Sequence, residues 1–201
     1  MKKTIRLVAT LTIFCVVVGF LLAWTNSITK APIETALKKE MIAALSKVLP
    51  EHDNDIVTDV KAFKDKAGKE WTFYVARLKG TYRGTAFCST SERGYGGTIE
   101  VLVGVLPDAA VNGVEILRAD KETPGLGSKI REQGFRIQFK GKSASDTKWA
   151  AVTKDGGQID AVTGATISSR AVTEAVSAGL KMYAIHAAEI TGAEKRSAGK
   201  H

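Results

Sequence analysis

The strongest constraint on this 201-residue chain is an uncharged segment close to its N-terminus. No Asp, Glu, Lys or Arg occurs from Leu7 to Thr29, and the residues from Leu7 to Trp24 are almost all apolar. A membrane-spanning helix needs roughly 20 apolar residues. We therefore expect one transmembrane helix at residues 7–27, with Trp24 at the membrane–water interface. A cleavable signal peptide is the alternative, but the apolar segment is long for one and no Ala-x-Ala cleavage site follows it.

Basic residues beside this segment predict its orientation. Lys30 is the only basic residue close behind the segment, and Lys38 and Lys39 follow further along. Cytoplasmic flanks of membrane helices carry an excess of Lys and Arg. We therefore expect residues 1–6 to be cytoplasmic, and the rest of the chain to lie on the extracytoplasmic side of the cell (inner) membrane. Three basic residues precede the apolar segment: Lys2, Lys3 and Arg6.

A second helix is expected at residues 28–50. Apolar side chains recur there at helical spacing from Ile33 through Leu37 to Val48, and Pro50 ends the pattern. Thr29 is the expected N-cap. We expect this linker helix to pack its apolar stripe on the domain that follows.

The pattern then becomes typical of strands, because apolar and polar residues alternate between turn residues. Asn112-Gly113 is an expected turn, and a final helix is expected after Thr166. These elements predict an α+β fold: a single transmembrane helix, then a globular domain at residues 51–192 with a mostly antiparallel sheet and packed helices. Residues 193–201 are expected to form a flexible tail. The predicted strands cover residues 57–63, 71–78, 82–89, 98–106, 114–119, 135–139 and 159–162.

Composition excludes several classes of function. The net charge is +8, but no dense basic cluster or aromatic-plus-basic recognition motif occurs, so nucleic acid is not an expected partner. No Cys-x-x-Cys or histidine cluster predicts a metal site. Cys88 lies in a strand-like segment and is expected to be a buried free thiol. No Ser/His/Asp order or pair of carboxylates predicts catalytic residues that transform a substrate.

A hydroxyl-rich loop precedes the last predicted helix. Thr163, Thr166, Ser168 and Ser169 surround Gly164 within seven residues. Backbone N–H groups at a helix start are unpaired and lie at the positive end of the helix dipole, so this loop suits a phosphate. A threonine hydroxyl in it could also be esterified to a phosphate. The alternative is an ordinary turn in which Ser or Thr caps the helix and nothing binds.

Two glycine-rich segments occur earlier in the chain. Gly94-Tyr95-Gly96-Gly97 precedes a predicted strand, and Glu122-Thr123-Pro124-Gly125-Leu126-Gly127 follows the next one. Glycines permit close approach of the backbone to a ligand, and proline stiffens a loop. A tight strand entry and an ordinary Pro-Gly turn are the alternatives for these segments.

Together, the three motifs resemble those of the G subunit of the Rnf ion-translocating electron-transport complex, which is a member of the FMN-binding domain family. The C subunit of the sodium-translocating quinone reductase belongs to a second, related family. Thr163-Gly164-Ala165-Thr166, with Asp160 three residues before it, is similar to the flavinylation motif of these proteins. There, a dedicated flavin transferase joins FMN through its phosphate to the last threonine. Asp160 either assists the transferase or starts the turn.

The resemblance implies a covalent phosphoester between FMN and Thr166. It also implies that no residue is catalytic, since Thr166 is a tether. Further cofactor contacts are expected from all three motifs: Tyr95, Glu122, Thr123, Leu126, Gly127, Thr163, Gly164, Ala165, Ser168 and Ser169.

The function implied is that of a redox protein within a membrane complex. Such a protein carries electrons in a complex that couples electron transfer between ferredoxin and NAD to ion translocation, and its partners are the other subunits of that complex. A subunit of a sodium-translocating quinone reductase and a free-standing membrane-anchored flavoprotein are alternatives. An alternative of another class is a non-redox anchored binding or scaffold module, in which residues 163–169 only cap a helix.

Overall fold

The structure is a computed structural model that describes residues 2–65 and 68–192 of the chain. The chain divides into two compact units, Met1–Met41 and Ile42–His201. The tail predicted at residues 193–201 lies outside the described residues.

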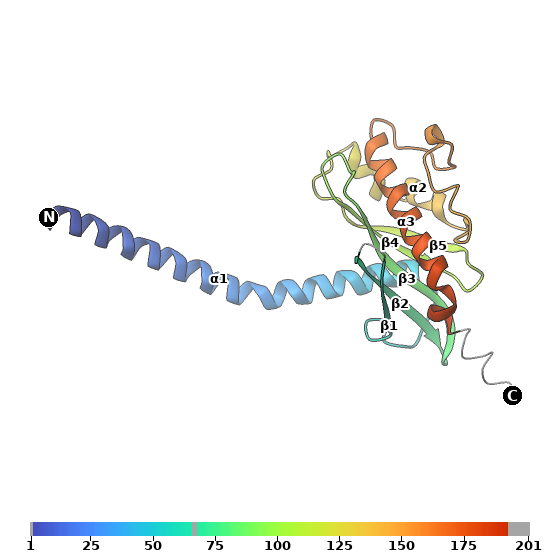
Figure 1. Ribbon diagram of the computed structural model, residues 1–201, viewed down its shortest axis with the longest axis horizontal. Coiled ribbons are helices and arrows are strands. Elements are labelled where there is room, and N and C mark those ends of the chain that lie inside the picture. The colour runs from blue at the N-terminus through green and yellow to red at the C-terminus, as the bar shows by residue number, and fades with distance from the viewer. Residues whose placement is uncertain (1, 66–67, 193–201) are drawn as a thin grey trace. The chain divides into compact units, whose positions relative to one another are not determined.

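The first unit consists of most of helix α1 (Lys2–Val48), which is drawn in blue in Figure 1. This helix is long and apolar enough to cross a membrane. Its threonine hydroxyls donate hydrogen bonds to carbonyl groups one turn earlier, which satisfies polar groups that would otherwise be costly in lipid. These bonds run from Thr10 to Arg6, from Thr12 to Val8 and from Thr25 to Leu21.

The linker helix predicted at residues 28–50 is not a separate element. Helix α1 continues through Thr29 and Pro32 to Val48. The Thr29 hydroxyl donates to the Thr25 carbonyl oxygen at 2.8 Å, so it bonds to the preceding turn and does not cap a new helix. The prediction of an N-cap at Thr29 is therefore wrong.

The apolar stripe of this region is only partly covered. Ala44, Leu45 and Val48 are buried, whereas Ile33 and Leu37 are exposed. Only the last turns of α1 therefore form part of a hydrophobic core.

The second unit is built on an antiparallel sheet of five strands, in the order β1-β2-β3-β4-β5. Each strand pairs with its neighbour in sequence. This confirms the predicted α+β class with an antiparallel sheet. The strands are β1 (Val60–Lys64), β2 (Glu70–Leu78), β3 (Thr81–Ser91), β4 (Ile99–Val105) and β5 (Val111–Arg118).

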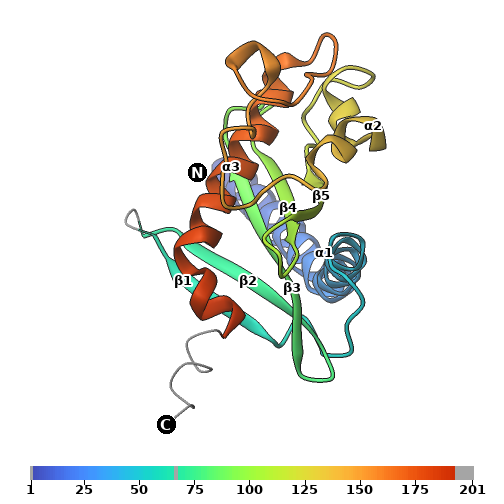
Figure 2. The ribbon, with the colours of Figure 1, turned by 90° about the vertical axis from the view of Figure 1, so that its right-hand side faces the viewer.

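Helix α3 (Thr166–Thr191) covers one face of this sheet (Figure 2). The helix lies so close to β3 that a Cβ atom on Gly179 would overlap with the Phe87 ring. The Ser89 hydroxyl also donates to the Ala175 carbonyl oxygen at 2.7 Å. Burial of the apolar side chains between helix and sheet stabilises both elements and fixes the position of α3 on the sheet.

The end of α1 packs against the same sheet. A Cβ atom on Gly104 would overlap with the carbonyl oxygen of Val48. The Asn112 side chain donates to that oxygen at 2.8 Å. Asn112 and Gly113 therefore belong to β5 and do not form the predicted turn, because the sheet needs small or hydrogen-bonding residues where Val48 approaches it. The turn lies at residues 107–110, where Ala109 has a φ of +60°.

The strand predicted at residues 135–139 is also wrong. Those residues form the end of α2 (Gln133–Arg136) and a 3₁₀ turn, η2 (Ile137–Phe139). Phe135 and Phe139 are buried and their ring centroids lie 5.5 Å apart, while Ile137 is exposed. Apolar residues at i, i+2 and i+4 fit a strand or a helix, and only i and i+4 reach the core here. At residues 159–162, only an isolated bridge joins Ile159 to Val152.

Two further 3₁₀ turns complete the second unit, η1 (Gly127–Arg131) and η3 (Thr153–Asp155). Cys88 is a free thiol that is partly buried in β3.

Gly104→Ala should destabilise the second unit by about 1–3 kcal/mol, because the added methyl group must displace Val48 from the sheet. Thermal unfolding of the solubilised full chain measures this loss. Gly134→Ala is the control, since a Cβ atom there has no neighbour within 4 Å. Equal melting temperatures for the Gly104→Ala and Gly134→Ala variants would contradict the close contact between Val48 and β4.

Cys88 should react slowly with alkylating agents in the folded protein. Burial raises the pKa of its thiol to about 12, so the reactive thiolate is scarce at pH 8. In a Cys15→Ser background, the alkylation rate at pH 8 should rise on the order of a thousandfold on unfolding. Equal rates in the native and unfolded chain would show that the thiol is accessible in the fold.

Candidate functional site

Three loops enclose a cavity of about 490 Å³ at one end of the second unit. The cavity brings together nine of the eleven residues predicted for the site and adds Ile167. Its lining consists of Tyr95, Glu122, Thr123, Leu126, Gly127, Gly164, Ala165, Thr166, Ile167 and Ser168.

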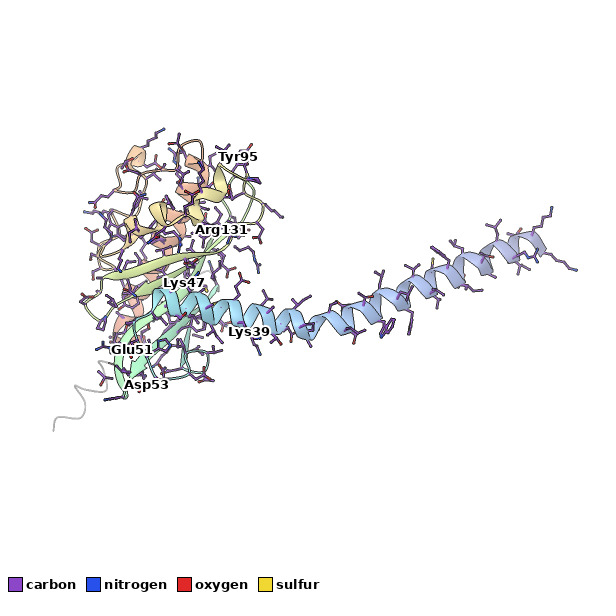
Figure 3. All side chains as sticks on the ribbon, turned by 180° about the vertical axis from the view of Figure 1, so that it is seen from behind. Lys39, Lys47, Glu51, Asp53, Tyr95 and Arg131 are labelled. Atoms are coloured by element: carbon purple, nitrogen blue, oxygen red, sulfur yellow. The ribbon has the colours of Figure 1, made fainter. Side chains whose placement is uncertain are left out.

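The register of the sheet explains why the loops meet. Strands β4 and β5 are antiparallel and pair Glu100 with Arg118. The loop before β4 and the loop after β5 therefore lie at the same end of the sheet. Tyr95 comes from the first loop, at the end of the domain away from Asp53 (Figure 3). The start of α3 supplies the third wall of the cavity.

Glu122 connects all three loops. Its side chain is buried, with an exposed fraction of 6%. The Ser168 hydroxyl at the start of α3 donates to Glu122 Oε2 at 2.6 Å. The backbone N–H of Gly96 donates to Glu122 Oε1 at 3.1 Å. One carboxylate therefore holds the loop after β5, the loop before β4 and the first turn of α3 together.

The glycines of the motifs make room for this carboxylate and for the loop around it. A Cβ atom on Gly127 would overlap with Glu122 Oε2, and one on Gly94 would lie 2.8 Å from Oε1. A Cβ atom on Gly96 would overlap with the carbonyl oxygen of Lys121. These positions therefore need glycine for close packing of the loops against one another, before any ligand is considered.

The first turn of α3 is open toward the cavity. Its N-cap residue, Ala165, makes no side-chain capping hydrogen bond, and no acidic residue occurs in the first turn. Helix starts normally satisfy their free N–H groups with a capping oxygen. Here the cavity lies at that position, which disagrees with the interpretation of this loop as an ordinary capped turn.

Thr166 is the first residue of α3 and lines the cavity. It is partly buried, and its hydroxyl forms no hydrogen bond with any residue that the structure describes. Gly164, two residues earlier, has a φ of +78° and lets the chain turn into the helix. The hydroxyl of Thr166 is therefore available to a ligand in the cavity.

Two of the predicted contact residues lie outside the lining. Ser169 is fully buried, where its hydroxyl accepts from the Val162 N–H and donates to the Ala165 carbonyl oxygen, both at 3.0 Å. It therefore stabilises the loop from behind. Thr163 is exposed and does not line the cavity.

Large apolar side chains surround the mouth of the cavity. Tyr95, Leu126 and Ile167 are exposed by 69%, 46% and 48%. Ile167 was not predicted from the sequence, although its place directly after Thr166 in the first turn of a helix could have indicated it. An exposed apolar rim around polar N–H and hydroxyl donors suits a ligand with a flat apolar part and an anionic part.

The chemistry of the lining favours cofactor binding over catalysis. Only Tyr95 and Glu122 in the lining are titratable, and Glu122 is held by structural hydrogen bonds. Over residues 2–65 and 68–192, no group of His, Cys, Asp and Glu side chains could hold a metal ion. The volume lies within the roughly 300–1,000 Å³ range of typical ligand sites.

A larger groove of about 760 Å³ runs along the outer face of α3 and shares Ile167 with the cavity. Its charged side chains are largely paired. Arg170 forms two hydrogen bonds of 2.7 Å with Asp155, which hold the pKa of that carboxyl below its usual value. Arg93 pairs with Glu174 at 3.3 Å.

Comparisons with known proteins identify the family of the chain. The model of the FMN-binding domain family matches residues 94–181, which include all three motifs. Among solved structures, the chain is similar to the C subunit of the Na⁺-translocating NADH-quinone reductase from Parabacteroides distasonis. The two share 25% sequence identity with a TM-score of 0.48, over 67% of this chain and 69% of the other.

Curated relatives match nearly the whole chain. The G subunit of the ion-translocating oxidoreductase complex from Aliivibrio fischeri strain ES114 is 36% identical, over 94% of this chain and 93% of the relative. Its counterpart from Cereibacter sphaeroides ATCC 17023 is also 36% identical, over 89% and 83%. The resemblance first seen in the three motifs is thereby confirmed, and the chain belongs to the family formed by the G subunits of ion-translocating oxidoreductase complexes.

Proposed function

We propose that this chain is the membrane-anchored, FMN-carrying electron-transfer subunit of an ion-translocating oxidoreductase complex, and that its FMN is joined by a phosphoester to Thr166. The observation that carries the proposal is the uncapped first turn of α3, which presents the free Thr166 hydroxyl to a cavity of suitable size. The relatives named above are subunits of such a complex.

The residues present fit the parts of FMN. The phosphate suits the N–H groups at the start of α3, next to Gly164 and Ala165, because the helix dipole and the unpaired donors both favour an anion there. The ring suits the apolar rim formed by Tyr95, Leu126 and Ile167. Thr123 supplies a further hydroxyl in the lining for the ribityl chain.

Attachment requires an activated phosphate. The bond formed joins Thr166 Oγ1 to the FMN phosphorus, the bond broken is the phosphorus–oxygen bond to an activating phosphate or nucleotide group, and the hydroxyl proton passes to that departing group or to solvent. Among the described residues that line the cavity, no side chain is placed as a base for that proton, because the Glu122 carboxylate already accepts from Ser168 and Gly96. We therefore assign this step to a separate flavin transferase that acts on the exposed loop.

Bound FMN supplies the capacity to accept and donate electrons. The chain itself binds the cofactor, orients it and limits access of water. It is a redox subunit of an oxidoreductase, and its partners are the other subunits of the complex. Electron flow between ferredoxin and NAD, implied by the family resemblance, is part of the proposal.

The alternatives are less well supported. A non-redox scaffold would use the hydroxyl-rich loop as a helix cap, but Ala165 occupies the N-cap and makes no capping bond. A role in a quinone reductase or as a free-standing flavoprotein is disfavoured, because G subunits of ion-translocating oxidoreductase complexes match about nine-tenths of the chain.

Thr166→Ala should abolish covalent flavin, because the variant lacks the hydroxyl that forms the ester. The chain is co-expressed with a flavin transferase, and flavin fluorescence is read from a denaturing gel. Thr163→Ala is the matched control, since Thr163 lies in the same loop but outside the cavity. Thr166→Ser should remain fluorescent. A dark wild-type band would rule out covalent FMN, and a fluorescent Thr166→Ala band would rule out this attachment residue.

The globular domain should lie on the extracytoplasmic side, because three basic residues precede the apolar segment of α1 and one closely follows it. Protease added to intact spheroplasts should digest the domain, whereas sealed inverted vesicles should protect it. Detergent-permeabilised vesicles serve as the control for protease activity. Digestion in inverted vesicles alone would place the domain in the cytoplasm.

A further inference from the structure

The wall of the cofactor cavity contains a buried carboxylate without a cation partner. Glu122 is 6% exposed, and its two hydrogen-bond donors, the Ser168 hydroxyl and the Gly96 N–H, are neutral. Among the residues that the structure describes, none forms an ion pair with it, including its neighbour Lys121 and the nearby Lys129. Burying a carboxylate costs free energy unless hydrogen-bond donors stabilise it, so a buried carboxylate beside a ligand cavity needs an explanation.

Hydrogen bonds fix the position of this carboxylate. One oxygen accepts a hydrogen bond from the loop before β4, and the other accepts one from the first turn of α3. Gly94 and Gly127 pack so close to the carboxylate that neither position has room for a Cβ atom. The carboxylate therefore cannot turn away from the cavity when a ligand enters. The carboxylate therefore acts on that ligand from a fixed position.

We propose that the Glu122 carboxylate lowers the reduction potential of the flavin in this cavity. Two electrons from a donor in the complex and one proton from solvent leave one negative charge on a flavin ring. A fixed carboxylate in the same cavity repels that charge, and burial weakens the screening by water. The oxidised, neutral ring is not repelled, so the reduced form alone is disfavoured. The inference rests on the proposed function of the site.

The start of α3 acts in the opposite direction. Its positive dipole end and free N–H groups favour negative charge in the cavity. The helix start would therefore raise the potential of a flavin bound in this cavity, whereas the carboxylate would lower it. The two contributions to the reduction potential come from different elements, so replacing the Glu122 side chain changes one and leaves the other.

The alternative is that Glu122 only fastens the three loops together. Glu122→Gln distinguishes the two roles, because the amide has nearly the same shape and removes only the charge. Ser168→Ala makes the opposite change: it removes the contact at 2.6 Å and keeps the carboxylate. A purely structural role predicts similar effects of the two variants on the potential.

The test is a spectroelectrochemical titration of the flavin-loaded, solubilised full chain. We expect the midpoint potential of Glu122→Gln to shift to a more positive value, and that of Ser168→Ala to shift less, because this variant keeps the carboxylate. Glu174→Gln is the matched control, because this carboxylate lies on α3 outside the cavity and pairs with Arg93. An unchanged midpoint in Glu122→Gln, or equal shifts in Glu122→Gln and Ser168→Ala, would overturn the inference.

Loading is checked first by fluorescence on a denaturing gel. If Glu122→Gln carries no flavin, Thr123→Asp and Thr123→Asn replace it, because Thr123 lies in the same wall. The proposal then predicts a lower midpoint for the Asp variant than for the Asn variant, and equal values would overturn it. A dark wild-type band contradicts the proposed function itself, whereas a loaded wild type with an unmoved Glu122→Gln midpoint contradicts only the role of Glu122.

Discussion

The hydrogen bonds of the buried Glu122 carboxylate hold together parts of the chain that are far apart in sequence. Ser168 at the start of α3 and Gly96 before β4 both donate to it. The glycines at positions 94 and 127 are needed because this carboxylate and the loops around it leave no room for a Cβ atom. The cavity, its apolar rim and the open helix start all depend on this arrangement of the three loops.

Helix α3 serves both the core and the site. Its buried face packs on the sheet at Phe87 and Gly179, and this contact fixes the position of the helix on the sheet. The free N–H groups of its first turn then face the cavity, with Thr166 as the first residue. A helix anchored over more than six turns can present an uncapped start, because its stability comes from packing and does not depend on the cap.

The three motifs noted in the sequence contribute residues to one cavity of the structure, and their use as a cofactor site stays a prediction. The fold was predictable in its strands and last helix, where the apolar periodicity is clear. The errors occurred where tertiary contacts decide the local structure. The apolar residues within 135–139 fit the period of a strand and that of a helix, and they form helical turns. Asn112-Gly113 resembles a turn but lies in β5, because Val48 packs against it. The contacts of Glu122 could not be predicted, because they join residues that only the sheet brings together.

The β4–β5 hairpin touches the end of α1 at one end, through Gly104 and Asn112, and the cofactor loops at the other, through Gly94 and Glu122. From Gly104 to Glu100 the paired part of β4 covers four residue steps, which corresponds to roughly 13 Å at about 3.3 Å per residue. The hairpin is thus a spacer of constant length between the last turn of α1 and the loops that line the cavity. A ligand in the cavity stays at that distance from the last turn of α1, because the paired strands of the hairpin join the two places.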